Sequence, residues 1–326
     1  MAALISGAVY GASTVAAGVY APSTIINQFK FQDWHMLQTS LGAVASSAII
    51  YKIAERFGYV KLKPRSSSPI GLFGQYDGNV IGGFLLGAGM ALSGSCPGTL
   101  FAQVGAGLRT GFYALGGAIA GGVAYTGYVA QAAKAQREKA DVKPETVTLD
   151  ENLGLSKDTA VAIFESFCLS AIAASVSYTT GSDWSLFSAG GGLFIGFSQL
   201  FSILTRRSML GISGSYEEFG NHFWWLTRGA SWPNSRQNTL FAAGMASGAL
   251  ALTKIFPSLV PNDIVEVSPW LAGIGGFMMI VGSRLAGGCT SGHGVSGLSL
   301  MSTSSLVTMS TAFAAGSLIA PLVHRD

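Results

Sequence analysis

Two cysteines of this 326-residue chain lie in glycine-rich apolar segments that share one spacing. The interval from Gly83 to Cys96 equals the interval from Gly276 to Cys289, and each glycine is the second of a Gly-Gly-Phe triplet. A thiol that recurs at the same place in two similar segments indicates a duplicated unit. The spacing therefore predicts that Cys96 and Cys289 form a paired thiol site.

Small and hydroxyl-bearing residues surround both thiols. Glycine permits tight turns and close backbone approach, and Pro97 has no amide hydrogen to leave unpaired. A short half-helix after each cysteine, expected at residues 99–107 and 294–302, would aim free N–H groups at a cavity, which suits a small oxyanion. Thiols would add soft, weak donors. The predicted substrate-binding residues are Gly94, Ser95, Cys96, Pro97, Gly98 and Thr99 in the first motif and Gly288, Cys289, Thr290, Ser291, Gly292 and His293 in the second.

His293 is the fourth residue after Cys289, a spacing that would allow joint metal ligation on a continuous helix. Two ligands are too few for a zinc site, and the glycines at 292 and 294 favour a turn. We therefore expect no metal and no cofactor, and a pathway-lining or structural hydrogen-bonding role for His293. The third cysteine, Cys168, has no counterpart in the repeat and is expected to be a small buried apolar residue.

The elements that position these motifs are predicted to be membrane helices. Charged residues make up 11% of the chain and hydrophobic residues 49%, whereas soluble domains carry about 25% charged residues. The apolar runs lack the alternation of barrel strands, so we expect an all-α integral membrane protein. Each run is about long enough to cross the lipid core. About nine spans are expected, at residues 4–26, 36–54, 80–95, 112–129, 160–178, 187–204, 240–256, 271–285 and 306–323.

The position of the cysteines in this series predicts two repeats of opposite orientation. Cys96 follows the third expected span and Cys289 the eighth, so five crossings separate them and the direction reverses. Inverted repeats are typical of transporters that bind substrate near the bilayer midplane. We expect a first membrane repeat at residues 1–130, a hydrophilic linker at 131–158, helical from about 130 to 140, and a second repeat at 159–326.

Basic residues divide unequally between the two sides. Loops after even-numbered spans hold 15 of the 19 Lys and Arg residues, and the opposite side holds 4. By the positive-inside rule the N-terminus is expected in the cytoplasm and the C-terminus outside, most simply in the cell membrane. Basic residues that flank spans are no sign of nucleic-acid binding. We therefore expect membrane lipid, and no nucleic acid, as a binding partner.

Few charged residues lie near the thiol motifs. Arg109 and Arg284 are close to the expected half-helices and could attract an anion or anchor the helix at the membrane edge. Glu217 and Glu218 are expected to be solvated loop residues. The chain has no Gly-Lys-Ser/Thr phosphate-binding pattern, so ATP-driven transport by this chain alone is not expected.

The motif Ser-Gly-Ser-Cys96-Pro-Gly-Thr, the motif Leu-Ala-Gly-Gly-Cys289-Thr-Ser-Gly-His293-Gly-Val-Ser-Gly and their duplication resemble the YeeE/YedE family of sulfur transporters. The resemblance covers residues 4–323 apart from the linker. It implies an hourglass-like helical bundle that imports thiosulfate or a related small sulfur-containing anion, rather than an enzyme. It also implies that Cys96 and Cys289 contact the anion at a central constriction. A cytoplasmic sulfur-carrier protein is a further partner that this function allows.

An enzymatic alternative stays open. A thiolate could attack the outer sulfur of thiosulfate and keep it as a persulfide, which would make the chain a membrane sulfurtransferase. That reaction needs a nearby base or cation, and in the sequence only His293 and Arg284 are close to a cysteine.

Overall fold

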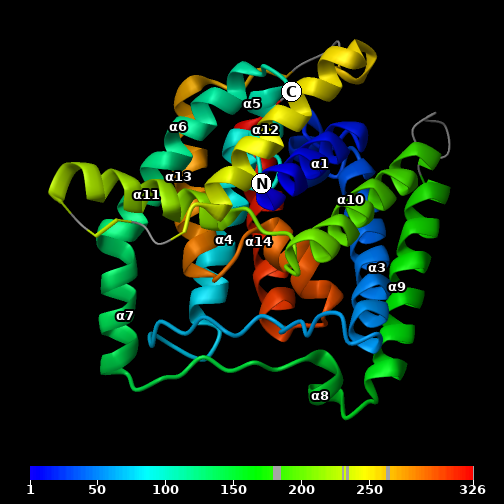
Figure 1. Cartoon of the computed structure of the whole chain (residues 1–326), viewed down its shortest axis with the longest axis horizontal. Coiled ribbons are helices and arrows are strands. Elements are labelled where there is room, and N and C mark those ends of the chain that lie inside the picture. The colour runs from blue at the N-terminus through cyan, green and yellow to red at the C-terminus, as the bar shows by residue number, and fades with distance from the viewer. Residues whose placement is uncertain (179–184, 230, 233–234, 262–264, 326) are drawn as a thin grey trace.

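The computed structural model describes residues 1–178, 185–229, 231–232, 235–261 and 265–325. These residues form helices and no β-strand, so the all-α prediction is confirmed. Figure 1 shows the helices around a centre formed by α4, α13 and α14, with α9 at one side and α7 at the other. The helices are α1 (Ala2–Ala16), α2 (Pro22–Phe29), α3 (His35–Arg56), α4 (Asp77–Ser93), α5 (Leu100–Gly105), α6 (Arg109–Ala124), η1 (Tyr125–Val129), α7 (Ala130–Lys139), α8 (Leu149–Leu153), α9 (Lys157–Tyr178), α10 (Ser185–Arg206), α11 (Ser213–Arg228), α12 (Gln237–Ile255), η2 (Pro257–Leu259), α13 (Pro269–Leu285), η3 (Thr290–Gly297) and α14 (Thr303–Val323).

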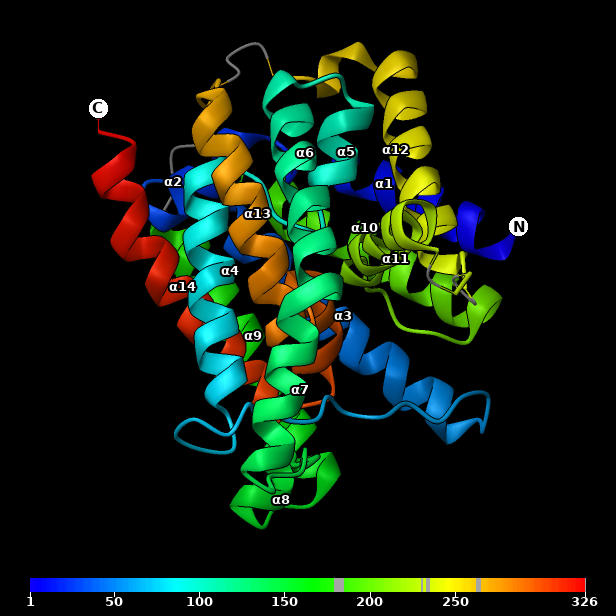
Figure 2. The ribbon, with the colours of Figure 1, turned by 90° about the vertical axis from the view of Figure 1, so that its left-hand side faces the viewer.

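Helices α4 and α13 cross at the centre of the molecule, where glycine lets their backbones approach closely. A Cβ at Gly82 would lie 2.5 Å from the carbonyl oxygen of Gly282, and a Cβ at Gly275 would lie 2.6 Å from that of Gly89. Any larger side chain would push the helices apart, and small residues are the usual basis of such contacts in membranes. Figure 2 shows α14 beside α4 and α6 beside α13. These four helices form the core that ends at the two cysteine motifs.

Four more of the long helices pack in two pairs beside this core. Helix α1 packs on α12, and α3 packs on α10. In the first pair Gly7 and Gly11 of α1 face the backbone of α12, while Gly244 and Gly248 of α12 face the backbone of α1. Both helices thus carry two glycines one helical turn apart, the spacing that allows closely packed membrane helices.

The prediction of one span over residues 4–26 is wrong. Helix α1 ends at Ala16, the chain turns, and α2 begins at Pro22, because proline's fixed φ suits the first turn of a helix. Figures 1 and 2 both show α1 lying across the direction of α4 and α13. The sequence concealed this break because residues 17–21 are themselves apolar or small.

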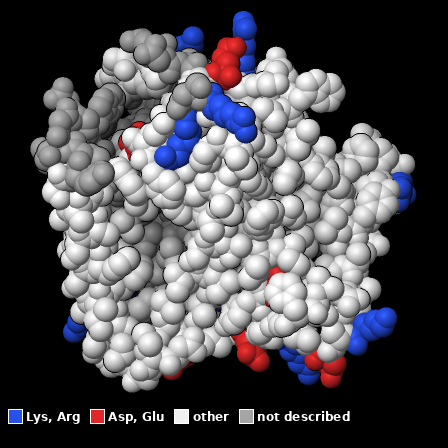
Figure 3. Space-filling view, turned by 180° about the vertical axis from the view of Figure 1, so that it is seen from behind, with Lys and Arg blue, Asp and Glu red and all other residues white. Residues whose placement is uncertain are grey.

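Two described helices are long and apolar enough to cross a membrane alone, α9 and α14. Helix α13 together with η3 would make a third, although the two are bent by 48° relative to each other. Figure 3 shows charged side chains gathered toward the top and bottom of one face, with a broad band between them that is nearly free of charge. Both observations are consistent with an α-helical membrane protein.

The loop between α3 and α4 is fixed beneath the core helices. The buried Asp77 carboxylate accepts N–H bonds from residues 70–73 of the loop, and Asn79 accepts one from Ser68 at 2.8 Å. The Ser68 hydroxyl donates to the carbonyl of Leu285 at 2.6 Å. The linker contributes as well, since Ser67 N donates to Glu145 O at 2.7 Å. Helix α7 confirms that the linker is helical at its start.

Candidate functional site

The two cysteine motifs meet around Gly98. A Cβ at this glycine would lie 3.3 Å from Tyr10 Oη, 3.5 Å from Ser291 Cβ and 3.6 Å from Cys96 Sγ. The first motif, the second motif and helix α1 therefore converge on one small space. Cys96 and Cys289 are close enough to interact electrostatically.

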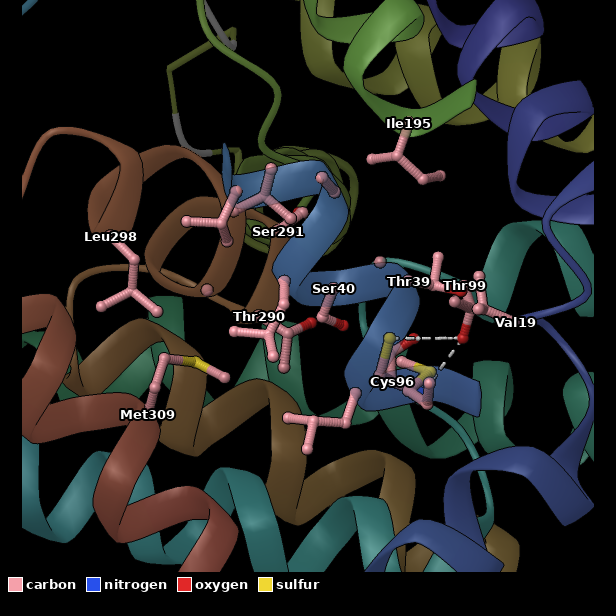
Figure 4. A pocket seen from close by; sticks show the side chains of 18 of the residues that line it. Val19, Thr39, Ser40, Cys96, Thr99, Ile195, Thr290, Ser291, Leu298 and Met309 are labelled. Atoms are coloured by element: carbon pink, nitrogen blue, oxygen red, sulfur yellow. Dashed lines mark hydrogen bonds between the residues drawn. The ribbon is translucent and has the colours of Figure 1, made fainter. Parts of the chain in front are cut away.

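Cys96 lies in the turn that follows α4 and is buried. Its Sγ is 3.3 Å from Thr99 Oγ1, a contact drawn as a dashed line in Figure 4. The turn begins at Gly94, whose φ of +58° is unfavourable for a residue with a side chain. The chain then re-enters a helical turn, because the N–H groups of Thr99 and Leu100 both donate to Cys96 O.

Gln103 holds this turn in place from the following short helix, α5. Its Nε2 donates to the carbonyls of Tyr20 and Gly94 at 2.8 and 2.9 Å. Its Oε1 accepts a hydrogen bond from Ser95 Oγ at 2.5 Å. Ser95 and Gly94 thus support the backbone around Cys96 and do not line the cavity beside it. The sequence gives only a weak sign of the role of Gln103, because it is a single side-chain amide in an apolar segment.

Cys289 is buried at the start of η3, surrounded by hydrogen-bond donors. Its Sγ is 3.2 Å from Ser291 Oγ. The N–H groups of Gly292 and Ile212 and the hydroxyl of Ser213 also approach the sulfur. Helices α10 and α11 meet at residues 207–212, so the connection between them supplies part of the environment of this thiol.

A cavity of about 510 Å³ opens beside Cys96. None of the described residues that line it is charged, and most are apolar. Thr290 Oγ1 is buried beside the Cys96 thiol and makes no hydrogen bond to a nitrogen or oxygen atom of the described residues, so it can bind a ligand. Figure 4 shows Cys96, Thr99, Thr290 and Ser291 around this space. Tyr10, Thr39 and Ser40 add hydroxyls that sequence reasoning missed, because they come from α1 and α3, far from either motif.

Five of the twelve predicted binding residues line this cavity: Cys96, Gly98, Thr99, Thr290 and Ser291. The other seven do not line it. These seven are Gly94, Ser95, Pro97, Gly288, Cys289, Gly292 and His293. Among them, the carbonyl oxygen of Pro97 lies 3.4 Å from the Tyr216 hydroxyl.

His293 is buried and both ring nitrogens have partners. Nδ1 lies 2.8 Å from Ser305 Oγ, and Nε2 lies 3.0 Å from the carbonyl of Ala286. A histidine bound in this way fixes the η3 turn against α13 and α14. Among the described residues no group of three His, Cys, Asp or Glu side chains could hold a metal ion.

The acidic residues of α11 are not solvated loop charges, so that prediction is wrong. Glu217 pairs with Arg284. Glu218 is buried and accepts hydrogen bonds from the backbone and side chains of Asn238 and Thr239, at the start of α12. Both glutamates find ion-pair or hydrogen-bond partners because α11 packs against the ends of α12 and α13. Arg284 is therefore neutralised by an ion pair, while Arg109 begins α6.

The chain is similar to known transport proteins. It is 28% identical over 291 residues to a protein named thiosulfate transporter TsuA from Spirochaeta thermophila, and the match covers 84% of both chains. It is 31% identical over 117 residues to a probable transporter from Xylella fastidiosa, which is 36% of this chain and 78% of that protein. Residues 16–319 match the profile of the family described as Sulphur transport. Because that match spans nearly the whole chain and both cysteine motifs, this protein belongs to the sulphur transport family.

Proposed function

We propose that this protein imports thiosulfate, or a related small sulfur-containing anion, past the two cysteine motifs that meet at Gly98. The observation that carries the proposal is the convergence of both cysteine motifs on one uncharged cavity. Family membership and the similarity to a protein named as a thiosulfate transporter support the substrate class.

The chemistry of the lining suits brief binding. Thr290 Oγ1 is a buried hydroxyl beside the Cys96 thiol that makes no hydrogen bond to a nitrogen or oxygen atom of the described residues. The Cys96 thiol also contacts the hydroxyl of Thr99. Hydroxyl and thiol groups can donate hydrogen bonds to an oxyanion although they carry no positive charge. A fixed positive charge would hold the anion more tightly. Conduction needs sites that bind weakly enough to release the ion. Cys289 would act at the adjoining constriction, where donors surround its sulfur.

Inverted repeats with a pseudo-two-fold axis between α4 and α13 are part of the proposal. The offset that relates Cys96 to Cys289 also relates Gly82 to Gly275 and Gly89 to Gly282. In the structure Gly82 faces Gly282, while Gly89 faces Gly275. This exchange is expected of two related helices that pack on each other in opposite directions. The Xylella relative matches 117 residues that are most of its own length, as a chain with a single repeat would.

We extend this to two membrane repeats at residues 1–130 and 159–326, joined by the linker at 131–158, in an hourglass-like bundle. The loop at 57–76 and the linker lie together at the lower end of Figure 1. Ser66 and Thr146 join them by a hydrogen bond of 2.7 Å. Both segments are rich in Lys and Arg, which supports a cytoplasmic location for this end and import toward it. A sulfur-carrier protein would receive the anion there.

The test is uptake of labelled thiosulfate by cells that lack their own importer. Cys96→Ala and Cys289→Ala are each expected to reduce uptake at least tenfold while the protein still reaches the membrane, by the loss of contacts at the constriction. Cys168→Ala is the matched control, because this buried thiol of α9 lines neither the cavity nor the motifs. Normal uptake by both Cys96→Ala and Cys289→Ala would overturn the assigned role of the thiols.

The sulfurtransferase alternative rests on the donors around Cys289. Hydrogen bonds from Ser291, Gly292, Ile212 and Ser213 would stabilise a thiolate. In this reaction the thiolate forms a bond to the outer sulfur of thiosulfate, the sulfur–sulfur bond of thiosulfate breaks, and sulfite leaves with the electron pair. Mass spectrometry of the protein after exposure to thiosulfate distinguishes the two functions. A stable added sulfur on Cys289 favours the enzyme, and an unmodified thiol favours passage.

A further inference from the structure

A second cavity, of about 570 Å³, lies on the loop side of the thiol motifs. Two cations, Lys63 and Arg65, line it together with four serines, and none of the described residues in its lining is acidic. It differs in this respect from the uncharged cavity at Cys96. The four serines are Ser66, Ser67, Ser68 and Ser208.

Arg65 reaches inward from the loop and has no carboxylate partner among the described residues. Its Nη1 donates to Gly287 O at 3.2 Å, whereas its Nε is buried with no hydrogen-bond partner. Burial lowers the pKa of the Arg65 guanidinium from its ordinary value, although an arginine side chain remains protonated in proteins. A partly buried cation without a counterion is costly, which favours an anion beside it.

A second polar group lies near this guanidinium. Tyr51 is 1% exposed. Its hydroxyl lies near Ser296, whose Oγ donates to Leu210 O and can still accept a hydrogen bond from Tyr51. Tyr51 and Arg65 are close enough to interact electrostatically, and Tyr51 packs beside Met209, which lines the cavity. Tyr51 does not itself line the cavity, so the donors available to an oxyanion there come from Arg65, Lys63 and the serines.

The guanidinium lies directly behind the second thiol motif. A Cβ at Gly292 would be 2.9 Å from Arg65 Nη2, and a Cβ at Gly288 would be 3.6 Å from Nη1. Gly287 lines the basic cavity, while Thr290 and Ser291 line the cavity at Cys96. The segment that carries Cys289 is thus a thin wall between an uncharged space and a positively charged one.

We infer that the basic cavity around Arg65 is a second binding site for a small oxyanion, which the anion occupies on the loop side of the thiol constriction. The identity of the anion as thiosulfate rests on the proposed function. Arg65 supplies the charge and directional N–H donors, and Lys63 adds a second, exposed charge. An anion that has passed weak, uncharged donors meets a stronger site, which favours its movement past the thiols.

Equilibrium binding of labelled thiosulfate to the purified full-length protein in detergent tests this site. The background is the double variant Cys96→Ala/Cys289→Ala, in which the thiol contacts are absent. This background is expected to retain binding that Arg65→Gln weakens at least tenfold, the effect of losing a charged hydrogen bond. Lys63→Gln should weaken it less, because Lys63 is exposed. Lys61→Gln is the matched control, since this basic residue of the same loop does not line the cavity.

Arg65→Gln is expected to fold, because the loop is held at this point through the backbone. The carbonyl of Arg65 accepts hydrogen bonds from Ser302 and Ser304 at 2.7 and 3.0 Å. If that variant does not fold, Ser208→Asp decides, because it places a carboxylate in the cavity without altering Arg65. Loss of binding in Ser208→Asp supports the site, and unchanged binding overturns it.

The outcomes separate this inference from transport itself. The second site is overturned if the double cysteine variant binds no thiosulfate. It is also overturned if Arg65→Gln and Lys61→Gln weaken binding equally. Both conclusions hold whatever the uptake result. Arg65-dependent binding in a protein that takes up no thiosulfate overturns the proposed function and leaves the site standing.

Discussion

At the scale of single residues, the convergence at Gly98 explains why two motifs from opposite halves of the chain belong to one site. The shared spacing of Cys96 and Cys289 predicted that the two motifs lie together, and five of the twelve residues predicted from it line one cavity. The spacing could not predict Tyr10 or Arg65, because neither repeats in the sequence and each reaches the thiols only through tertiary packing. Arg65 had one local sign, an arginine followed by three serines between two prolines.

Gly98→Ala is expected to reduce thiosulfate uptake strongly with little loss of stability. The added methyl would fill the space between Tyr10 Oη, Ser291 Cβ and Cys96 Sγ, at distances of 3.3 to 3.6 Å. Uptake and the thermal unfolding temperature in detergent are the measurements. Gly116→Ala is the control, because a Cβ there would meet nothing within 4 Å. Equal uptake by the two variants would show that the anion does not pass Gly98.

Gln103→Leu is expected to lower both stability and uptake. The substitution leaves Ser95 Oγ and the carbonyls of Tyr20 and Gly94 without their partner, and a buried polar group left unpaired costs about 1–3 kcal/mol. Thermal unfolding in detergent measures the loss. The exposed Gln131 on α7 provides the comparison, since Gln131→Leu should change neither quantity. A Gln103→Leu protein of normal stability would contradict the bracing role.

At the scale of elements, apolar runs located most helices but not their breaks. The runs at 36–54, 160–178 and 306–323 fall within α3, α9 and α14. The run at 4–26 is divided because its turn is as apolar as its helices, and hydropathy alone carries no signal for such a turn. Helix α11 was missed for the opposite reason. It is amphipathic and carries Glu217 and Glu218, whose charges become satisfied only when α12 and α13 pack beside it.

Gly89→Ala and Gly282→Ala are expected to destabilise the protein by similar amounts. Each position faces the backbone of the opposite helix in the α4–α13 crossing, and overpacking of this kind costs about 1–3 kcal/mol. Because Gly89 contacts Gly275 and Gly282 contacts Gly82, the two effects should add in the double variant. Thermal unfolding of both single variants and the double variant is the measurement. A large effect at one position and none at the other would argue against equivalent repeats.

At the scale of the whole molecule, charge is gathered toward its ends while the two cavities lie on either side of one thin segment. The linker and the loop at 57–76 form one end of the molecule. Composition and charge counts were sufficient to predict a membrane protein and an asymmetry between its ends. They could not predict that the loop folds back under the thiols, because Asp77, Asn79 and Ser68 hold it there through tertiary contacts.

The orientation of the molecule can be measured with single introduced cysteines and a membrane-impermeant thiol reagent, since all three native thiols are buried. Ser66→Cys, in the exposed basic loop, is expected to react in inside-out vesicles and not in intact cells. Arg325→Cys, after α14, is expected to react in intact cells. The reverse pattern would place the basic cavity on the outer face.

The crossing of α4 and α13 has a consequence for assembly. Each of these helices covers its glycine face with the other, so neither half of the chain can shield that face alone. A chain that carried one such unit would have to recruit a second copy inserted the opposite way up in the bilayer. If the two halves are the inverted repeats proposed above, joining two copies in one polypeptide gives each glycine face its partner without a separate dimer.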